Sequence, residues 1–273
     1  MIVTLLTDFG LADHYVASMK GVILSVDARI QIVDISHEVP PFDTNHAAFL
    51  LAASHSWFPR VTVHVVVVDP GVGSERRPLA IRAMGSYFVG PDNGVLSLAV
   101  AGARDLEVVA IDPRRIREEA PSSTFHGRDI FAPAAAALAT GTPLSALGPS
   151  IDDMVVLPGQ IAKRSADGAL EGAVIHVDHY GNCVTSLRPQ DFGTVDWRDC
   201  EFVVQGRRVD RTARFYDEGS ETEPFVLLGS TGYLEVALRQ GSAAERLGIR
   251  TGDPVRAEPR AATRVPADRA LLL

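Results

Sequence analysis

In the first half of the chain, short apolar runs alternate with segments whose apolar side chains recur at helical spacing. Ile2–Leu6 predicts a short buried strand, and the apolar side chains of Ala12–Val26 share one face of a helix. Val61–Val68 is β-branched almost throughout, which is typical of a central strand that helices cover on both faces. The other predicted elements are strands at Gln31–Ile35, Pro78–Ala83, Tyr87–Val89 and Glu107–Ile111, and helices at Ala47–Trp57 (capped by Asp43 or Thr44), Gly94–Ala99 and Asp129–Ala139. Strands that alternate with helices predict an α/β domain with a mostly parallel sheet over residues 1–160.

The hydrophobic pattern changes after Pro158. Ile161–Gly168 is polar and predicts a linker, and the segments that follow are short, strand-like and separated by turn residues. The predicted strands are Ala173–Val177, Cys183–Leu187, Glu201–Val204, Pro224–Leu228 and Tyr233–Ala237. This pattern predicts a smaller all-β domain, a barrel or a sandwich, over residues 170–258. The tail after Asp253 is rich in Arg, Ala and Pro, and we expect it to be loosely ordered.

Composition limits the classes of function. The chain has 273 residues, of which 46% are hydrophobic, and a formal net charge of -8. This charge argues against a nucleic-acid partner, whose phosphates an acidic surface would repel. The longest strongly apolar stretch is far too short to span a bilayer and no signal-peptide pattern opens the chain, so we expect a cytoplasmic protein with no membrane partner. The two cysteines, Cys183 and Cys200, form neither a disulfide framework nor a zinc motif.

The end of the central strand carries the first candidate site. Asp69 follows Val61–Val68, and a proline and two glycines then bend the chain so that Arg76 returns toward the carboxylate. In parallel sheets ligands lie beyond the carboxyl ends of the strands. A carboxylate at this place that is oriented by a guanidinium therefore makes Asp69 and Arg76 a candidate catalytic pair. A capped turn with a surface salt bridge explains the same residues, and both interpretations remain open.

A second candidate lies at the entry to the Ala-rich helix. His126 stands beside Gly127 in the run Thr124–Asp129, where an imidazole is able to point into a pocket as a hydrogen-bond donor or proton shuttle. A histidine that only caps the helix or packs locally is the alternative. Asp8 ends the first strand, and a carboxylate there is able to accept both hydroxyls of a ribose. Neither a dinucleotide nor a Walker glycine loop is present, and the acids and histidines lack metal-ligand spacing, so we expect no cofactor and no metal.

Together with features of the second half, these residues form an ordered series of motifs between residue 7 and about residue 240. The motifs are Thr7-Asp8-Phe9-Gly10, Asp34-Ile35-Ser36-His37, Val68-Asp69-Pro70-Gly71-Val72-Gly73, Gly90-Pro91-Asp92-Asn93-Gly94, Thr124-Phe125-His126-Gly127-Arg128-Asp129, Asp178-His179-Tyr180-Gly181-Asn182 and Gly232-Tyr233-Leu234-Glu235. The series resembles the S-adenosylmethionine (SAM) hydrolases that form adenosine, also called SAM hydroxide adenosyltransferases, which are homologous to the SAM-dependent fluorinase and chlorinase. Taken singly, the motifs of the second half also fit ordinary hairpin loops and core residues.

The resemblance implies an N-terminal α/β domain, a C-terminal β-barrel-like domain, and a homotrimer in which a neighbouring subunit completes each site. Asp69, Arg76 and His126 match the triad that positions and activates water. The resemblance also implies a substrate-binding set, with Asp8 on the ribose, Phe215 stacked on adenine, Asn182 at the adenine edge, Asp178 and Ser230 at the amino and carboxylate groups of methionine, and Asp13, Thr124, Phe125 and Tyr180 close by. SAM is then the substrate, and no separate cofactor is implied.

The halogenases of this group carry a hydroxyl residue where this chain has Gly127, and they lack the acid and the imidazole found here at Asp69 and His126. The resemblance therefore favours attack of water at C5′ of the ribose over attack of a halide. Two alternatives stay open, a SAM-dependent halogenase and a non-catalytic protein that senses SAM or adenosine.

Overall fold

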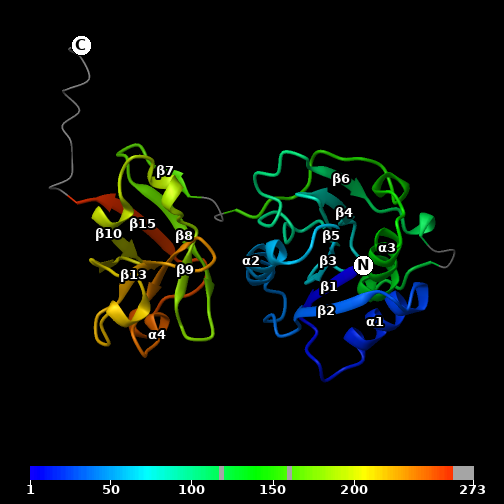
Figure 1. Ribbon diagram of the computed structural model, residues 1–273, viewed down its shortest axis with the longest axis horizontal. Coiled ribbons are helices and arrows are strands. Elements are labelled where there is room, and N and C mark those ends of the chain that lie inside the picture. The colour runs from blue at the N-terminus through cyan, green and yellow to red at the C-terminus, as the bar shows by residue number, and fades with distance from the viewer. Residues whose placement is uncertain (117–119, 159–161, 261–273) are drawn as a thin grey trace, which may run out of the picture. The chain divides into compact units, whose positions relative to one another are not determined.

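The computed structural model describes residues 1–116, 120–158 and 162–260. The chain separates into two compact units, Met1–Leu157 and a second unit that begins at Pro158. Figure 1 shows each unit with its own layers of secondary structure. The described helices include none that is long and apolar enough to cross a membrane.

The first unit is an α/β sandwich around one sheet. Its elements are β1 (Ile2–Thr7), α1 (Tyr15–Val26), β2 (Gln31–Ser36), α2 (Thr44–Ser54), β3 (Val63–Val67), β4 (Pro78–Ala83), β5 (Ser86–Pro91), β6 (Glu107–Ala110) and α3 (Ala132–Ala139). The strand order is β2-β1-β3-β5-β4-β6, and β4 runs antiparallel to both of its neighbours while β2, β1, β3 and β5 run parallel. The predicted mostly parallel sheet is confirmed.

Alternation along the central strands divides the hydrophobic core between the two faces of the sheet. Val63, Val65 and Val67 of β3 join a core cluster with α1 and α3, whereas Val66 and Val68 join a second cluster with α2. Successive side chains of a strand point to opposite faces, so a strand that is apolar at every position requires helices on both sides. Figure 1 shows α1 and α3 on one side of the sheet and α2 on the other. The side chain of Asp43 caps α2 by accepting a hydrogen bond from the backbone N–H of His46, as predicted.

One helix prediction in the first unit needs correction. Gly94–Ala99 forms consecutive turns instead of a helix. Gly94 has a φ of +91°, and a Cβ there would meet Leu157 at 2.7 Å, so the segment begins in a conformation that a helix excludes. The predicted Ala-rich helix at Asp129–Ala139 is confirmed as helical, with a π-helical turn over Gly127–Phe131 that continues directly into α3.

The second unit is a nearly closed, barrel-like sheet of nine short strands. Its elements are β7 (Lys163–Arg164), β8 (Leu170–Val177), β9 (Cys183–Thr185), β10 (Cys200–Val204), β11 (Arg207–Val209), β12 (Arg211–Thr212), β13 (Phe225–Leu228), β14 (Leu234–Ala237), α4 (Ala243–Leu247) and β15 (Pro254–Pro259). The strand order is β11-β10-β15-β8-β9-β14-β13-β12, and β7 pairs with β8. Apolar side chains from these strands and from α4 form its core. The predicted all-β second half is confirmed.

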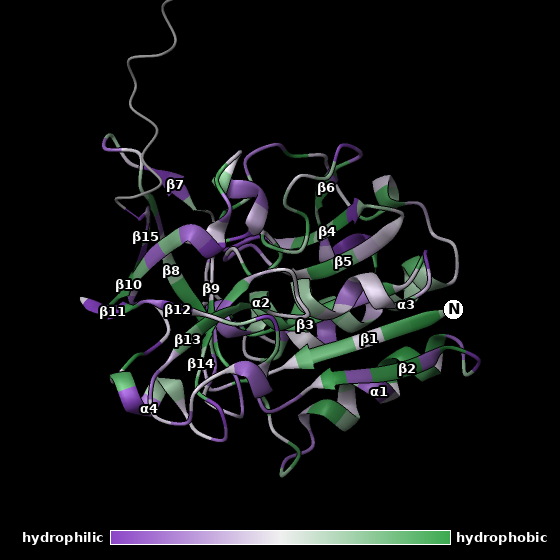
Figure 2. Cartoon of the chain, turned by 60° about the vertical axis from the view of Figure 1, so that its left-hand side comes forward, coloured by the Kyte–Doolittle hydropathy of each residue, from purple (hydrophilic) through white to green (hydrophobic). Residues whose placement is uncertain are grey.

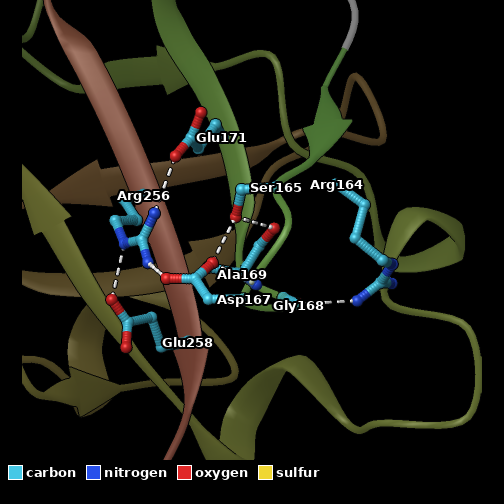
Figure 3. Close-up of polar contacts among 8 residues, drawn as sticks. All are labelled: Arg164, Ser165, Asp167, Gly168, Ala169, Glu171, Arg256 and Glu258. Carbon is cyan, nitrogen blue, oxygen red and sulfur yellow. Dashed lines mark hydrogen bonds and ion pairs between the residues drawn. The ribbon is translucent and has the colours of Figure 1, made fainter.

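The tail and the linker differ from the sequence prediction. Residues 254–259 form β15 between β10 and β8, so this part of the predicted loose tail is an interior strand. Arg256 of β15 pairs with Asp167 and donates hydrogen bonds to Glu171 at 2.7 Å and to Glu258 at 2.5 Å (Figure 3). These carboxylates neutralise Arg256, one of the arginines in the segment that was expected to be loosely ordered. Residues 261–273 and Ile161 lie outside the described residues.

The predicted linker also contains structure. Two of its residues, Lys163 and Arg164, form β7, which pairs antiparallel with β8. Figure 2 colours β7 as hydrophilic, and both side chains are exposed. A polar two-residue edge strand has no apolar alternation, so its pattern is the same as that of a linker. Both cysteines are buried and free, and burial raises the pKa of the Cys183 thiol to about 12.

Candidate functional site

An ion pair at the carboxyl end of β3 forms the centre of the site. Asp69 lies two residues beyond the end of β3, and the turn that follows brings the Arg76 side chain back against it. Nε of Arg76 donates to Oδ1 of Asp69 at 2.8 Å, and Nη2 donates to Oδ2. The two side chains are 9% and 5% exposed, respectively. This is a bidentate, largely buried guanidinium–carboxylate pair, which fixes both the position and the orientation of the carboxylate.

His126 joins this pair from a different part of the chain. Nη2 of Arg76 lies 2.6 Å from Nδ1 of His126, which stands at the start of the π-helical turn before α3. The two loops approach closely because of Gly73, where a Cβ would lie 2.4 Å from the carbonyl oxygen of Ser123. Gly73 also has a φ of +79°. Any side chain at this position would push the Asp69 loop away from the His126 loop.

The Arg76 contact determines which nitrogen of His126 carries its proton. A guanidinium only donates hydrogen bonds, so Nδ1 must be the acceptor and the neutral ring carries its hydrogen on Nε2. Burial and the neighbouring Arg76 charge lower the pKa of His126, although Asp69 and Asp129 oppose the shift. His126 is therefore a neutral imidazole at neutral pH with Nε2–H as its remaining polar group.

A cavity of about 380 Å³ opens beside the cluster. Its lining combines the carboxylates of Asp8 and Asp69 and the imidazole of His126 with a mainly apolar wall. The full lining is Asp8, Phe9, Tyr15, Pro41, Phe42, Val67, Asp69, Val72, Thr124, Phe125, His126 and Gly127. A volume of this size, apolar walls and a few convergent polar groups are typical of a small-molecule site.

Asp8 also lines the cavity and directly follows the neighbouring strand β1. Its Oδ2 accepts a hydrogen bond from the backbone N–H of Phe42 at 2.9 Å. Phe9, Tyr15 and Phe125 form an aromatic cluster next to it, with ring centroids 5.2 to 6.0 Å apart. The carboxylate is therefore held in place by a backbone contact and bordered by aromatic rings.

In the second unit, Asp178 and Asn182 belong to one tight turn. Oδ1 of Asp178 accepts hydrogen bonds from the backbone N–H groups of Tyr180 and Asn182, each at 2.9 Å, and Oδ2 accepts one from the Asn182 side-chain amide at 2.9 Å. Asp178 thus orients the Asn182 amide. The Tyr180 side chain at the tip of this turn is 76% exposed.

Phe215 and Ser230 lie on two other loops of the second unit. Phe215 is 51% exposed and Ser230 is also exposed. The hydroxyl of Tyr216, the residue after Phe215, donates to Oε2 of the buried Glu235 on β14 at 2.8 Å. Burial raises the pKa of the Glu235 carboxyl, and Asp178 adds to the shift while the Tyr216 hydrogen bond opposes it. The exposed aromatic ring of Phe215 is suited to stacking against a flat ligand.

The structure brings some of the sequence-predicted residues together in the first unit. Asp8, Asp69, Thr124, Phe125 and His126 line the cavity, and the Arg76 side chain contacts two of them. Asp13 is exposed in the turn between β1 and α1 and is not part of the lining. The remaining five predicted residues belong to the second unit and are described there alone: Asp178, Tyr180, Asn182, Phe215 and Ser230.

Sequence analysis did not name seven of the lining residues as site residues, namely Phe9, Tyr15, Pro41, Phe42, Val67, Val72 and Gly127. Phe42 could have been predicted from the sequence, because a large aromatic side chain directly after two prolines in a turn is expected to be exposed rather than buried in the core. In the parts of the chain that the structure describes, no group of three or more His, Cys, Asp and Glu residues is placed to hold a metal ion.

A buried carboxylate, a guanidinium and a neutral imidazole beside an apolar cavity define a small-molecule site at the carboxyl end of a parallel α/β sheet. Models of the SAM hydroxide adenosyltransferase family match both halves of the chain, the N-terminal domain at residues 3–148 and the C-terminal domain at residues 172–256. The chain belongs to this family.

Individual relatives agree with this assignment. The chain is 40% identical over 262 residues to the (R)-S-adenosyl-L-methionine hydrolase of Thermus thermophilus, covering 92% of this chain and 97% of the relative. A crystal structure of an uncharacterized conserved protein from Thermotoga maritima superimposes with a TM-score of 0.82 at 36% identity, covering 94% of this chain and 99% of that chain. A fluorinase from Actinoplanes is 25% identical over 283 residues, covering 92% of this chain and 95% of the relative.

Proposed function

We propose that this protein hydrolyses S-adenosyl-L-methionine to adenosine and L-methionine, by attack of water at C5′ of the ribose. The relative from Thermus thermophilus carries the R configuration in its name, and we extend that preference at the sulfonium to this chain. The observation that carries the proposal is the Asp69–Arg76–His126 cluster at the wall of a cavity of suitable size. A carboxylate that faces the cavity repels a halide but accepts a hydrogen bond from water, which favours hydrolysis over halogenation.

The leaving group determines what the protein must supply. The C5′–S bond breaks with its electron pair on sulfur, so a sulfonium departs as a neutral thioether and needs no acid. The demands that remain are a water molecule in line with the C5′–S bond and a site that excludes bulk solvent. The aromatic wall of Phe9, Tyr15 and Phe125 is suited to the second demand.

The hydrogen-bonding roles of the cluster then orient the water. Asp69 accepts a hydrogen bond from the water, and Nε2–H of His126 donates one to it. One lone pair of the water oxygen is left to attack C5′, and the proton released during attack passes to Asp69. Arg76 holds both partners through a single guanidinium. With Nδ1 occupied by Arg76, His126 acts as a hydrogen-bond donor to the water and not as the base.

The other parts of the substrate are bound, in this proposal, by residues that were predicted from the sequence. Asp8 holds the ribose hydroxyls with the oxygen that Phe42 does not engage. We place the adenine and methionine ends on the second unit of a neighbouring subunit within a homotrimer. The residues proposed for these ends are Asp178, Tyr180, Asn182, Phe215 and Ser230, with Thr124, Phe125 and Asp13 at the N-terminal side. Exposed aromatic rings at Tyr180 and Phe215 support this placement.

Substitution of Asp69 by Asn tests the proposed role of the carboxylate. The amide keeps the size of the side chain but loses the charge that accepts the proton of water. We expect kcat for SAM to fall by about 100-fold or more, the range in which a positioned proton acceptor contributes. We expect KM to change by less than about threefold, since Asp69 is assigned no ground-state contact with SAM.

The exposed Asp152 provides the matched control, because Asp152→Asn makes the same chemical change outside the cavity. Its kcat should equal that of the wild type. An Asp69→Asn protein that retains most of the wild-type rate would remove Asp69 from the mechanism.

A further inference from the structure

A buried histidine contacts the turn that carries Asp8. His37 follows β2 and is 4% exposed, and Thr7 at the end of β1 is 0% exposed. Nδ1 of His37 lies 2.8 Å from the hydroxyl of Thr7, directly before Asp8 in the chain. The backbone carbonyl of His37 also accepts a hydrogen bond from the N–H of Gly10 at 2.8 Å. His37 therefore contacts the chain on both sides of Asp8.

The other ring nitrogen of His37 faces an anion. Nε2 lies 3.1 Å from Oδ1 of Asp34, although the ring N–H is not aimed at the carboxylate closely enough for a well-formed hydrogen bond. Asp34 in turn accepts a hydrogen bond at 2.6 Å from Nζ of Lys20 on α1. Partial burial opposes ionisation, but the interactions with Lys20 and His37 hold the pKa of Asp34 below its ordinary value. The negative charge of Asp34 favours a hydrogen on Nε2 of His37.

A hydrogen on Nε2 of His37 fixes which group donates and which accepts in each contact between His37, Thr7 and Phe9. With its hydrogen on Nε2, His37 accepts at Nδ1, so the Thr7 hydroxyl must donate to it. The Thr7 oxygen then has a lone pair left for the backbone N–H of Phe9, which lies 3.2 Å away. The opposite tautomer would place a donor at Nδ1, would leave the Thr7 hydroxyl hydrogen without this acceptor, and would turn a lone pair of Nε2 toward the Asp34 carboxylate. Of the two neutral tautomers, only the first gives the Thr7 hydroxyl hydrogen an acceptor and also places Nε2–H toward Asp34.

We propose that His37 is a positioning residue for the Asp8 turn, with Asp34 selecting its tautomer and Thr7 transmitting its position to residues 8–10. The inference rests on the proposed function, in which Asp8 holds the ribose. His37 and Thr7 are buried and absent from the cavity lining, so neither acts on the substrate directly. Loss of the contact displaces the Asp8 carboxylate and weakens substrate binding, while the water-activating cluster on β3 keeps its geometry.

Two substitutions of His37 separate its contacts. In Asn, the amide oxygen reaches the position of Nδ1 and still accepts from Thr7. In Gln, the amide reaches the position of Nε2 near Asp34 and leaves Thr7 without its acceptor. We expect His37→Gln to raise KM for SAM by about tenfold with kcat within threefold, and His37→Asn to stay within about threefold of the wild type in both. Thr7→Val should match His37→Gln, Thr7→Ser should match the wild type, and the Thr7→Val/His37→Gln double variant should lose nothing further.

A second measurement tests the tautomer without any substrate. The ¹⁵N chemical shifts of the His37 ring, assigned by their loss in His37→Asn, should report a hydrogen on Nε2 and none on Nδ1. A hydrogen on Nδ1 would overturn the inference. Unchanged KM values in both His37→Gln and Thr7→Val would overturn it as well, as would a fall in kcat at constant KM. A wild-type protein that fails to hydrolyse SAM would instead refute the proposed function, and the ring shifts would still decide the His37 contacts.

Discussion

Replacement of Arg76 by Met tests whether the buried ion pair organises the site. Both side chains of the pair are almost fully buried, at 9% exposure for Arg76 and 5% for Asp69. Removal of the guanidinium leaves a buried carboxylate without a counter-charge, and breaking a buried pair from one side costs about 3 to 5 kcal/mol of unfolding free energy. Further replacement of Asp69 by Leu removes the stranded charge, so the double variant should regain about 2 kcal/mol or more.

The assay must report on the first unit alone. Urea unfolding, followed by hydrogen exchange of peptides from β1 and β3, meets this requirement because both strands lie in the core of that unit. Arg82→Met is the matched control, since Arg82 forms an exposed ion pair with Glu107 and its loss should not change stability measurably. Equal stability of Arg76→Met and Arg82→Met would refute the reasoning. Stability losses that simply add in the double variant would refute it too.

Three further outcomes follow from burial and charge. Gly127→Ser should still yield adenosine and no 5′-chloro product in chloride-rich buffer, because the Asp69 carboxylate still repels chloride; a chlorinated product detected by mass spectrometry would contradict this. Burial lowers the pKa of His64 to about 3, so the contribution of the neutral ring to the unfolding free energy is complete above the ordinary pKa of 6.5 and is lost progressively as the pH falls. Between pH 7 and pH 5 the unfolding free energy should fall by about 2 kcal/mol on account of His64, and urea unfolding curves of His64→Gln should lack this part of the pH dependence. The pKa of His126 is lowered as well, so kcat should stay constant as the pH falls to 6.5, the ordinary pKa of histidine, and should decrease only in more acidic buffer. A decrease in kcat that begins above pH 6.5 would contradict the neutral imidazole.

Local sequence patterns predicted those parts of the fold that depend on neighbours in the chain. The uninterrupted β-branched run at Val61–Val68 required a strand with two covered faces, and the structure places β3 there. The same pattern located Asp69 at the carboxyl end of a central strand. The glycines after it predicted a turn, and Gly73 adopts the positive φ that a turn of this kind requires.

Contacts between distant residues decided the parts that the sequence did not reveal. Residues 254–259 have the composition of a tail, but their backbone pairs with β10 and β8, which lie far away in the sequence, and Asp167 and Glu171 pair with Arg256. The 2.6 Å contact between Arg76 and His126 joins residues 50 positions apart, so no local pattern encodes it. For the same reason the sequence left the tautomer of His126, and with it the direction of its hydrogen bond to water, undetermined.

Membership of the family was predicted from the ordered motifs and is confirmed by the matches at residues 3–148 and 172–256. The roles of individual residues are a different matter. Asp178 and Asn182 form a hydrogen-bonded turn whose geometry fits an ordinary hairpin as well as a ligand contact. Their assignment to the substrate therefore stays a prediction until a bound ligand or a variant tests it.

Hydrolysis of SAM in oxygen-18 water tests the central claim most directly. The purified protein is incubated separately with the R and S sulfonium epimers of SAM, with and without chloride. The products are separated by chromatography and their masses are measured by mass spectrometry. The account predicts methionine and adenosine that carries the heavy oxygen at O5′, formed faster from the R epimer and unaffected by chloride. Adenosine without the label, a 5′-chloro product, or retention of SAM without turnover would contradict it.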